Sequence, residues 1–152
     1  MHNRNSYTRI NSFIFAILLL VVNGCSTNNP DWSDVNSNNS NNSSYMVRYR
    51  VNYDLPYPSK SNIVISLATK NGGTQYVEPQ GRNSVYYYGP YTKGQLLSVS
   101  FSATVPAPKL KTAEVSIDVS LDGESYVCVA HNSAESNSGT TNISVSTSYR
   151  IQ

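Results

Sequence analysis

The sequence holds few of the residues that most enzymes and metal proteins depend on. It has two cysteines, two histidines and one tryptophan among 152 residues. It has no Cys-x-x-Cys motif and no histidine pair at the spacing of a zinc site. Asp31 with Asp34, and Asp118 with Asp122, could contact calcium in principle, but neither pair lies in an EF-hand loop. We therefore expect no metal and no cofactor, and we expect Asp118 and Asp122 to share a solvated strand face.

The longest apolar run is too short for a membrane-spanning helix, which needs about 20 residues. This run, 13–22, is roughly ten residues long, and it follows Arg4 and Arg9 with no acidic residue before it. A positive segment before a short apolar one is typical of a secretory signal peptide. Residues 1–24 are therefore predicted to be a leader.

The leader ends in Val22-Asn23-Gly24-Cys25, which resembles the lipobox of bacterial lipoproteins. Asn23 departs from that pattern, because Ala, Ser or Thr usually fills its position. The resemblance implies cleavage before Cys25 and lipid on that cysteine, with several acyl chains giving a stable anchor. Ser26, where Asp would favour the inner membrane, implies the outer membrane of a Gram-negative bacterium, facing the periplasm or the surface. The plainer alternative is a secreted protein in which the cysteine falls there by chance.

Charge and cysteine content narrow the function further. The formal charge of +2 disappears with the leader, which leaves nine basic and nine acidic side chains. A neutral domain has no basic footprint for nucleic acid, so nucleic acid is not an expected partner. If lipid occupies Cys25, Cys128 has no partner within the chain, and we expect an unpaired thiol within a strand, with pairing between chains as the alternative.

A polar spacer separates the predicted anchor from the predicted domain. Residues 25–44 begin with the lipidated cysteine and continue as a Ser- and Asn-rich stretch that has too little apolar surface to order itself. Trp32 is the one aromatic residue in this tether. It is expected to touch the domain or the membrane surface, with a ligand-binding role as the second interpretation.

Residues 45–152 show the period-2 alternation of half-buried strands. Eight strands are predicted at 45–54, 63–67, 74–78, 84–88, 97–105, 115–121, 125–130 and 143–151. Gly89-Pro90 is expected to end the fourth strand, Asp122-Gly123 to form a two-residue hairpin turn, and 131–140 to be a polar loop. Seven or eight strands without a convincing helix predict an all-β, antiparallel β-sandwich, or else a small barrel.

Part of this pattern resembles the small immunoglobulin-like sandwich lipoproteins of gut bacteria and, more distantly, the MmpS-type periplasmic accessory domains. The residues that carry the resemblance are 49–51, 63–75, 93–99 and 115–123. The MmpS-type domains have a cysteine pair, whereas this domain has only Cys128. The resemblance implies an immunoglobulin-like fold with an accessory or binding role near a membrane, and it supplies no catalytic residue.

The remaining functional signal is a group of tyrosines, Tyr86-Tyr87-Tyr88 followed by Tyr91. Neighbouring strand residues face opposite ways, so at least one face must display phenol rings. Tyr86, Tyr88 and Tyr91 are the predicted ligand or partner surface, and the plainer interpretation is that they cover a sheet edge.

Catalysis is not expected. His131 is predicted to lie in a loop near Ser133 and Glu135, and this stretch does not match a nucleophile elbow. The sequence thus favours a non-catalytic lipoprotein that binds the membrane through its lipid and a protein or glycan through its sandwich. The alternatives are an adhesive subunit that assembles through the strand at 143–151, and a hydrolase.

Overall fold

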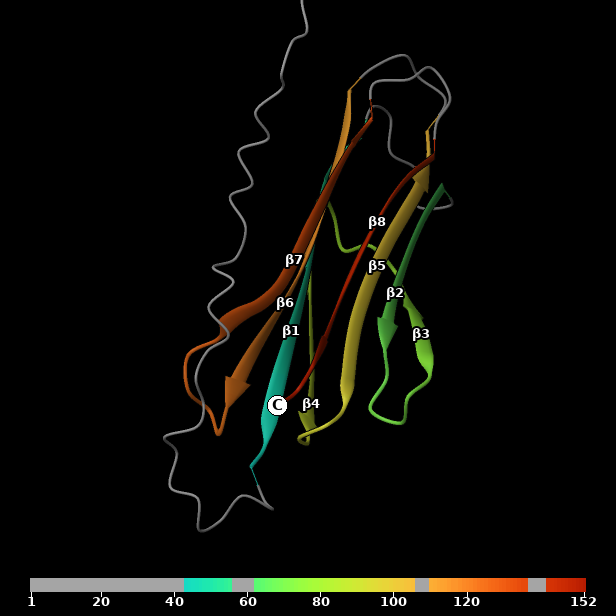
Figure 1. Ribbon diagram of the computed structural model, residues 1–152. Coiled ribbons are helices and arrows are strands. Elements are labelled where there is room, and N and C mark those ends of the chain that lie inside the picture. Colours follow the sequence, from blue (N-terminus) through green and yellow to red (C-terminus); the bar gives the residue numbers. More distant parts are fainter. Residues whose placement is uncertain (1–42, 56–61, 106–109, 137–141) are drawn as a thin grey trace, which may run out of the picture.

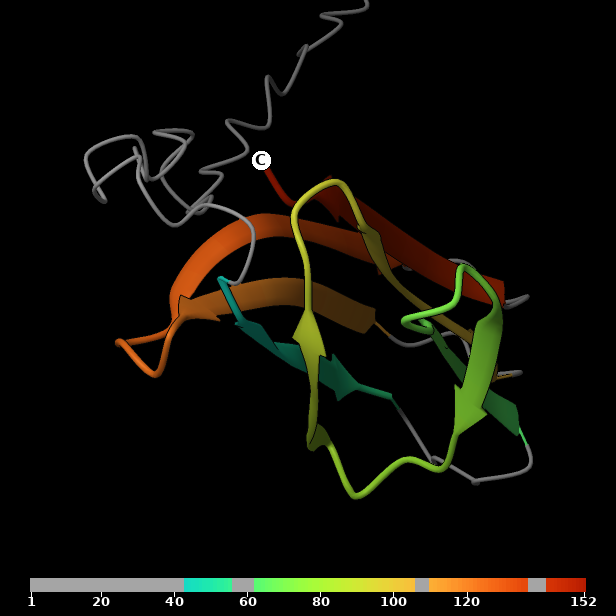
Figure 2. The same ribbon diagram turned by 90° about the horizontal axis from the view of Figure 1, so that it is seen from below.

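The computed structural model describes residues 43–55, 62–105, 110–136 and 142–152. These residues form eight strands and no α-helix: β1 (Tyr45–Asp54), β2 (Ile63–Ala68), β3 (Thr74–Val77), β4 (Asn83–Tyr91), β5 (Leu96–Thr104), β6 (Lys111–Leu121), β7 (Val127–Ser136) and β8 (Asn142–Arg150). The strands pack as two layers (Figures 1 and 2). The predicted all-β antiparallel sandwich is confirmed. The predicted leader and most of the tether, including Cys25 and Trp32, lie outside the described residues.

Each layer is a four-stranded sheet in which every pair of neighbours is antiparallel. Sheet A has the order β4-β1-β6-β7, and sheet B has the order β3-β2-β5-β8. The first two strands therefore lie in opposite sheets. In constant-type immunoglobulin domains the first two strands share a sheet, so the observed order is that of an antiparallel sandwich with a different arrangement.

The core lies between the two sheets and comes from one side of each alternating strand. In β1 the inward residues Val47, Tyr49 and Val51 are fully buried, while the residues between them are partly exposed. Across the interface, Tyr53 of β1 stacks on Phe101 of β5 with ring centroids 5.2 Å apart. Burying a large apolar side chain contributes about 1.5–3 kcal/mol, so this shared core accounts for the packing of the two sheets.

Strand β4 runs further than the sequence indicates. It continues through Gly89 and Pro90 to Tyr91, which pairs with Tyr45 of β1. One extra residue is accommodated as a β-bulge, because Val47 pairs with Tyr88 while Tyr45 pairs with Tyr91. Gly89 has a φ of 150°, and a Cβ there would lie 3.1 Å from the carbonyl oxygen of Tyr45. The prediction that Gly89-Pro90 ends the strand is wrong, because β4 continues past both residues through a bulge that takes up one extra residue.

The second difference is in β7, which extends to Ser136 along stretches predicted to be a loop. Its backbone forms a ladder with β6 that overrides the polar composition. The predicted turn at Asp122-Gly123 is present: the two residues have φ values of 49° and 87°, and the amide of Glu124 donates to the carbonyl of Leu121 at 2.9 Å. However, β7 begins at Val127 and not at Ser125, so the connection between the paired strands is longer than the predicted two residues. Positive φ at both central residues is the mark of a type I′ hairpin turn.

Two buried tyrosines differ in how their hydroxyls are satisfied. The hydroxyl of Tyr86 donates to the carbonyl of Glu78 at 2.6 Å. The hydroxyl of Tyr49 is buried without a hydrogen bond of acceptable geometry, although the phenol of Tyr91 is close enough to interact with it. Burial, with the neighbouring phenols of Tyr91 and Tyr88, raises the pKa of Tyr49 far above its ordinary value. Burying the Tyr49 hydroxyl without a hydrogen bond therefore lowers the free energy of unfolding.

We predict that Tyr49→Phe leaves the free energy of unfolding unchanged or raises it, because it removes an unsatisfied buried hydroxyl. Tyr86→Phe, the matched control, should lower it by about 0.5–1.5 kcal/mol, because the Glu78 carbonyl loses its donor. Urea unfolding of the two variants beside the wild type measures both. A larger loss in Tyr49→Phe than in Tyr86→Phe would contradict this account.

Candidate binding face

The structure separates the predicted tyrosine surface. Tyr86 and Tyr91 are buried in the core, and Tyr88 is half-buried against it, with its ring 6.1 Å from that of Tyr49. Tyr87, which points the other way, is 60% exposed. Because the inward face of β4 completes the core, the three predicted rings do not form a ligand surface. The display of a phenol ring on one face of this strand is confirmed, and the ring is that of Tyr87.

Tyr87 belongs to a row of side chains that crosses the outer face of sheet A. It pairs with Arg48 of β1, Arg48 pairs with Asp118 of β6, and Asp118 pairs with Cys128 of β7. The next row consists of Val85, Arg50, Ser116 and His131. It lies two residues along β4, β1 and β6, and three along β7, where the register shifts between Ile117 and Asp118. Residues directly opposite each other in antiparallel strands interact. The register thus brings two arginines and a carboxylate together from parts of the chain about 70 residues apart in sequence.

Asp118 is the centre of this group. Its side chain is 1% exposed, and both of its oxygens contact arginines. Nε of Arg48 donates to Oδ2 at 2.8 Å, and Nη2 of Arg50 donates to Oδ1 at 2.8 Å. Nε of Arg50 also lies 2.7 Å from Oδ2, but it is not aligned to donate a hydrogen bond. The expectation that Asp118 is simply solvated is wrong, because β1 supplies two cations directly beside it.

Aromatic rings flank the arginines. The guanidinium of Arg48 lies 4.7 Å from the ring centroid of Tyr126, and the rings of Tyr126 and Tyr87 meet edge to face at 6.0 Å. Burial alone would lower the pKa of Arg48, but the hydrogen bond and charge of Asp118, with smaller contributions from Tyr87, outweigh burial and raise it. The five residues Arg48, Arg50, Asp118, Tyr87 and Tyr126 are called the arginine–tyrosine face below.

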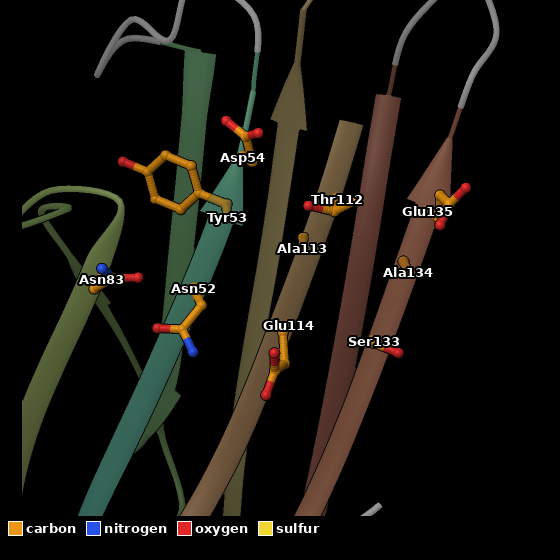
Figure 3. A pocket seen from close by; sticks show the side chains of 10 residues that line it. All are labelled: Asn52, Tyr53, Asp54, Asn83, Thr112, Ala113, Glu114, Ser133, Ala134 and Glu135. Carbon is orange, nitrogen blue, oxygen red and sulfur yellow. The ribbon is translucent and has the colours of Figure 1, made fainter. Parts of the chain in front are cut away.

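A hollow of about 400 Å³ lies further along the same sheet (Figure 3). Strands β1, β4, β6 and β7 all contribute to it. Its carboxylates are those of Asp54, Glu114 and Glu135. Asp54 pairs with Arg82, and Glu114 lies 3.0 Å from Nε2 of His131. Within the described residues, no group of three or more His, Cys, Asp or Glu side chains could hold a metal ion.

His131 lies on strand β7, so its prediction as a loop residue is wrong. Its side chain is mostly covered, and its Nε2 faces Glu114 of the neighbouring strand. Ser133 and Glu135 follow at alternate positions of the same strand and line the hollow. This arrangement holds the imidazole against a carboxylate at one nitrogen, within a ladder of paired strands.

Cys128 ends the row that contains Arg48 and Asp118, and it is disulfide-bonded. The expectation of an unpaired thiol is therefore contradicted. The chain's other cysteine, Cys25, lies outside the described residues. Because the sequence argument assigned the sulfur of Cys25 to lipid, the state of Cys128 bears directly on that assignment.

No protein-family model, no curated protein and no solved structure matches this chain. In the part of the chain that the structure describes, no helix has the length and apolar character needed to cross a membrane. The function is therefore argued from the chain's own residues.

Sequence reasoning missed the arginine–tyrosine face for a definite reason. The alternation of the first strand already put Arg48 and Arg50 on its polar side, and that of the sixth put Asp118 on its polar side. What was missing was the pairing of these two strands, which are separated by four others along the chain. One sequence signal could have suggested this pairing: two arginines stand at alternate positions of one strand, and an acid stands on the polar side of another.

We predict that Asp118→Asn lowers the free energy of unfolding by about 1.5–3 kcal/mol, because two charge-assisted hydrogen bonds lose the charge of their acceptor. Asp54→Asn is the control, since its pair with Arg82 is solvent-exposed and such pairs contribute about 0–1 kcal/mol. Chemical denaturation of both variants gives the comparison. Equal losses would show that the buried triad contributes no more than a surface ion pair.

Proposed function

We propose that this chain is a non-catalytic binding module whose arginine–tyrosine face contacts a protein partner, and that lipid holds it on a bacterial membrane through Cys25 when that sulfur is not in a disulfide. The preorganisation of that face carries the proposal. Arg48 and Arg50 are fixed by a carboxylate that is almost inaccessible to solvent, while their own side chains remain 29% and 39% exposed. A guanidinium has five N–H donors, so each arginine keeps donors to offer a partner.

The composition of the face supports a protein partner. Tyrosine and arginine are enriched at protein interfaces, and they dominate the residues whose truncation costs most binding energy. Side chains that are already ordered lose less entropy on binding. Here Asp118 and the ring of Tyr126 hold Arg48 on two sides. The surface is a sheet face, which suits an extended contact.

The leader supports the anchor. A positive segment, a short apolar run and Val22-Asn23-Gly24-Cys25 occur in the order that a lipoprotein signal requires. Ser26 in place of Asp favours the outer membrane as the location. The domain itself begins at one end of sheet A, because the amide of Ser44 donates to Oδ1 of Asp122 at 2.9 Å and the amide of Asp122 donates to the carbonyl of Ser44 at 2.9 Å.

The two alternatives have less support. Assembly through β8 would use the outer edge of sheet B, where β8 is the last strand and pairs only with β5. However, β7 lies close to β8, and Nδ2 of Asn132 donates to the carbonyl of Ser146 at 2.9 Å. A hydrolase needs a nucleophile oriented by its base, and the Nε2 of His131 faces Glu114 instead.

Photo-cross-linking in intact cells tests the binding face. A photoreactive phenylalanine analogue replaces Tyr87 on sheet A or, as the matched control, Tyr76 on sheet B, which is 73% exposed. We expect a discrete cross-linked protein from position 87 and none from position 76, and we expect the product to be lost in Arg50→Gln. Cross-links from position 76 alone, or from neither position, would contradict the proposal.

A further inference from the structure

We infer that residues 31–34 of the same chain, Asp31-Trp32-Ser33-Asp34, dock on the arginine–tyrosine face. The inference rests on the proposed function in that both use this surface, and it names the surface's first occupant as a segment of this protein's own tether. Four observations carry it: the excess positive charge of the face, its exposed aromatic rings, the point at which the chain enters the domain, and the composition of the segment before that point.

The face carries one positive charge in excess, because it has two arginines and one carboxylate. Arg48 and Arg50 share the single carboxylate of Asp118, and the row beside them adds no acid to this part of the sheet. Arg48 donates to Asp118 through Nε and Arg50 through Nη2, so other guanidinium N–H groups take no part in these two hydrogen bonds. Guanidinium groups bind carboxylates in charge-assisted pairs, so the face favours an acidic ligand.

The same face offers a place for an aromatic ring. Tyr87 is 60% exposed, and its ring meets that of Tyr126 edge to face, beside the guanidinium of Arg48. Indole packs well against tyrosine rings and against arginine. A ligand with acids on both sides of a tryptophan would therefore meet each feature of the face at once.

The tether contains such a ligand and little else that could bind. Between residues 26 and 44, Asp31 and Asp34 are the only charged residues, and Trp32 is the only aromatic one. In an extended chain, Asp31 and Asp34 lie about 10 Å apart. Arg48 and Arg50, two positions apart on β1, have long side chains that span a similar width.

The chain length permits this contact. Ser44 is hydrogen-bonded to Asp122, and Asp122 is only four positions from Asp118 along the chain, about 13 Å at strand spacing. The ten residues from Asp34 to Ser44 span up to about 33–36 Å when extended. The segment therefore reaches the face with slack. The Ser- and Asn-rich composition between Asp34 and Ser44 predicts a flexible linker. A short linker of that kind gives an effective concentration in the millimolar range, at which a few weak contacts would hold the segment.

Trp32 is the only tryptophan of the protein, so its fluorescence reports this contact without labelling. The experiment uses the protein purified in detergent and compares emission wavelength and acrylamide quenching in the wild type and three double variants. Arg48→Gln/Arg50→Gln removes the cations of the face. Asp31→Asn/Asp34→Asn changes the segment and leaves the folded domain intact. Lys70→Gln/Lys93→Gln removes the same charge from exposed turns of the domain and is the matched control.

We expect short-wavelength, weakly quenched emission in the wild type and in the lysine control. Both properties should shift towards those of free tryptophan in the arginine variant and in the aspartate variant, and in the wild type at high salt, which screens exposed charges. If the arginine variant does not fold, the emission of the aspartate variant alone shows whether Trp32 docks through these charges.

Three outcomes would overturn the inference. Emission like that of free tryptophan in the wild type would show that Trp32 is not docked. Shielded emission that the aspartate variant retains would place Trp32 in the detergent or elsewhere. Shielding that disappears on dilution would assign the segment to a second copy of the chain. The proposed function fails separately, because cross-linking from position 87 to another protein does not require Trp32 to be shielded.

Discussion

The buried carboxylate of Asp118 constrains the rest of sheet A. A charge removed from water must be paired and hydrogen-bonded, because the cost of desolvating it is otherwise several kcal/mol. Arg48 and Arg50 satisfy that requirement only when β1 and β6 pair in the observed register. A slip of one residue would turn Asp118 towards the core and Val119 towards solvent. The ion pairs and the hydrophobic alternation therefore specify the same register, and both arginines are held in place as a consequence.

Much of the fold could be predicted from the sequence, because period-2 alternation is a local property. The strands and the Asp122-Gly123 turn follow directly from residue type and spacing. Local signals failed where a neighbouring strand decides the outcome. Gly89 and Pro90 stay in β4 because β1 continues beside them, and the polar residues after Ala130 stay in β7 because β6 pairs with them.

The candidate site could be predicted only in part for the same reason. Alternation required that Tyr86 and Tyr87 face opposite ways, but it could not say which of them faces the core. The answer depends on Tyr86 packing between the sheets, which is tertiary information. Likewise, the polar side of the first strand was visible in the sequence, whereas the position of Asp118 between its two arginines was not.

The arginine–tyrosine face, the entry point of the chain and the tether together suggest how such a module could work. In the proposed module, the arginine–tyrosine face would bind by charge and aromatic contact, and residues 31–34 of the same chain would offer a segment of matching chemistry. A protein partner would then compete with that segment. This competition would favour partners that present acids beside an aromatic residue, because they meet the same contacts.

The proposed membrane anchor depends on the chemical state of the Cys25 sulfur. That sulfur can form a thioether to lipid or a disulfide, but not both, and Cys128 is disulfide-bonded in the structure while the chain has only one other cysteine. The intact mass of the protein, extracted from membranes without reductant, tests the central claim most directly. We predict a chain that begins at Cys25 and carries the mass of several acyl chains. An unlipidated chain, lighter by two hydrogens than its fully reduced form, would contradict the account.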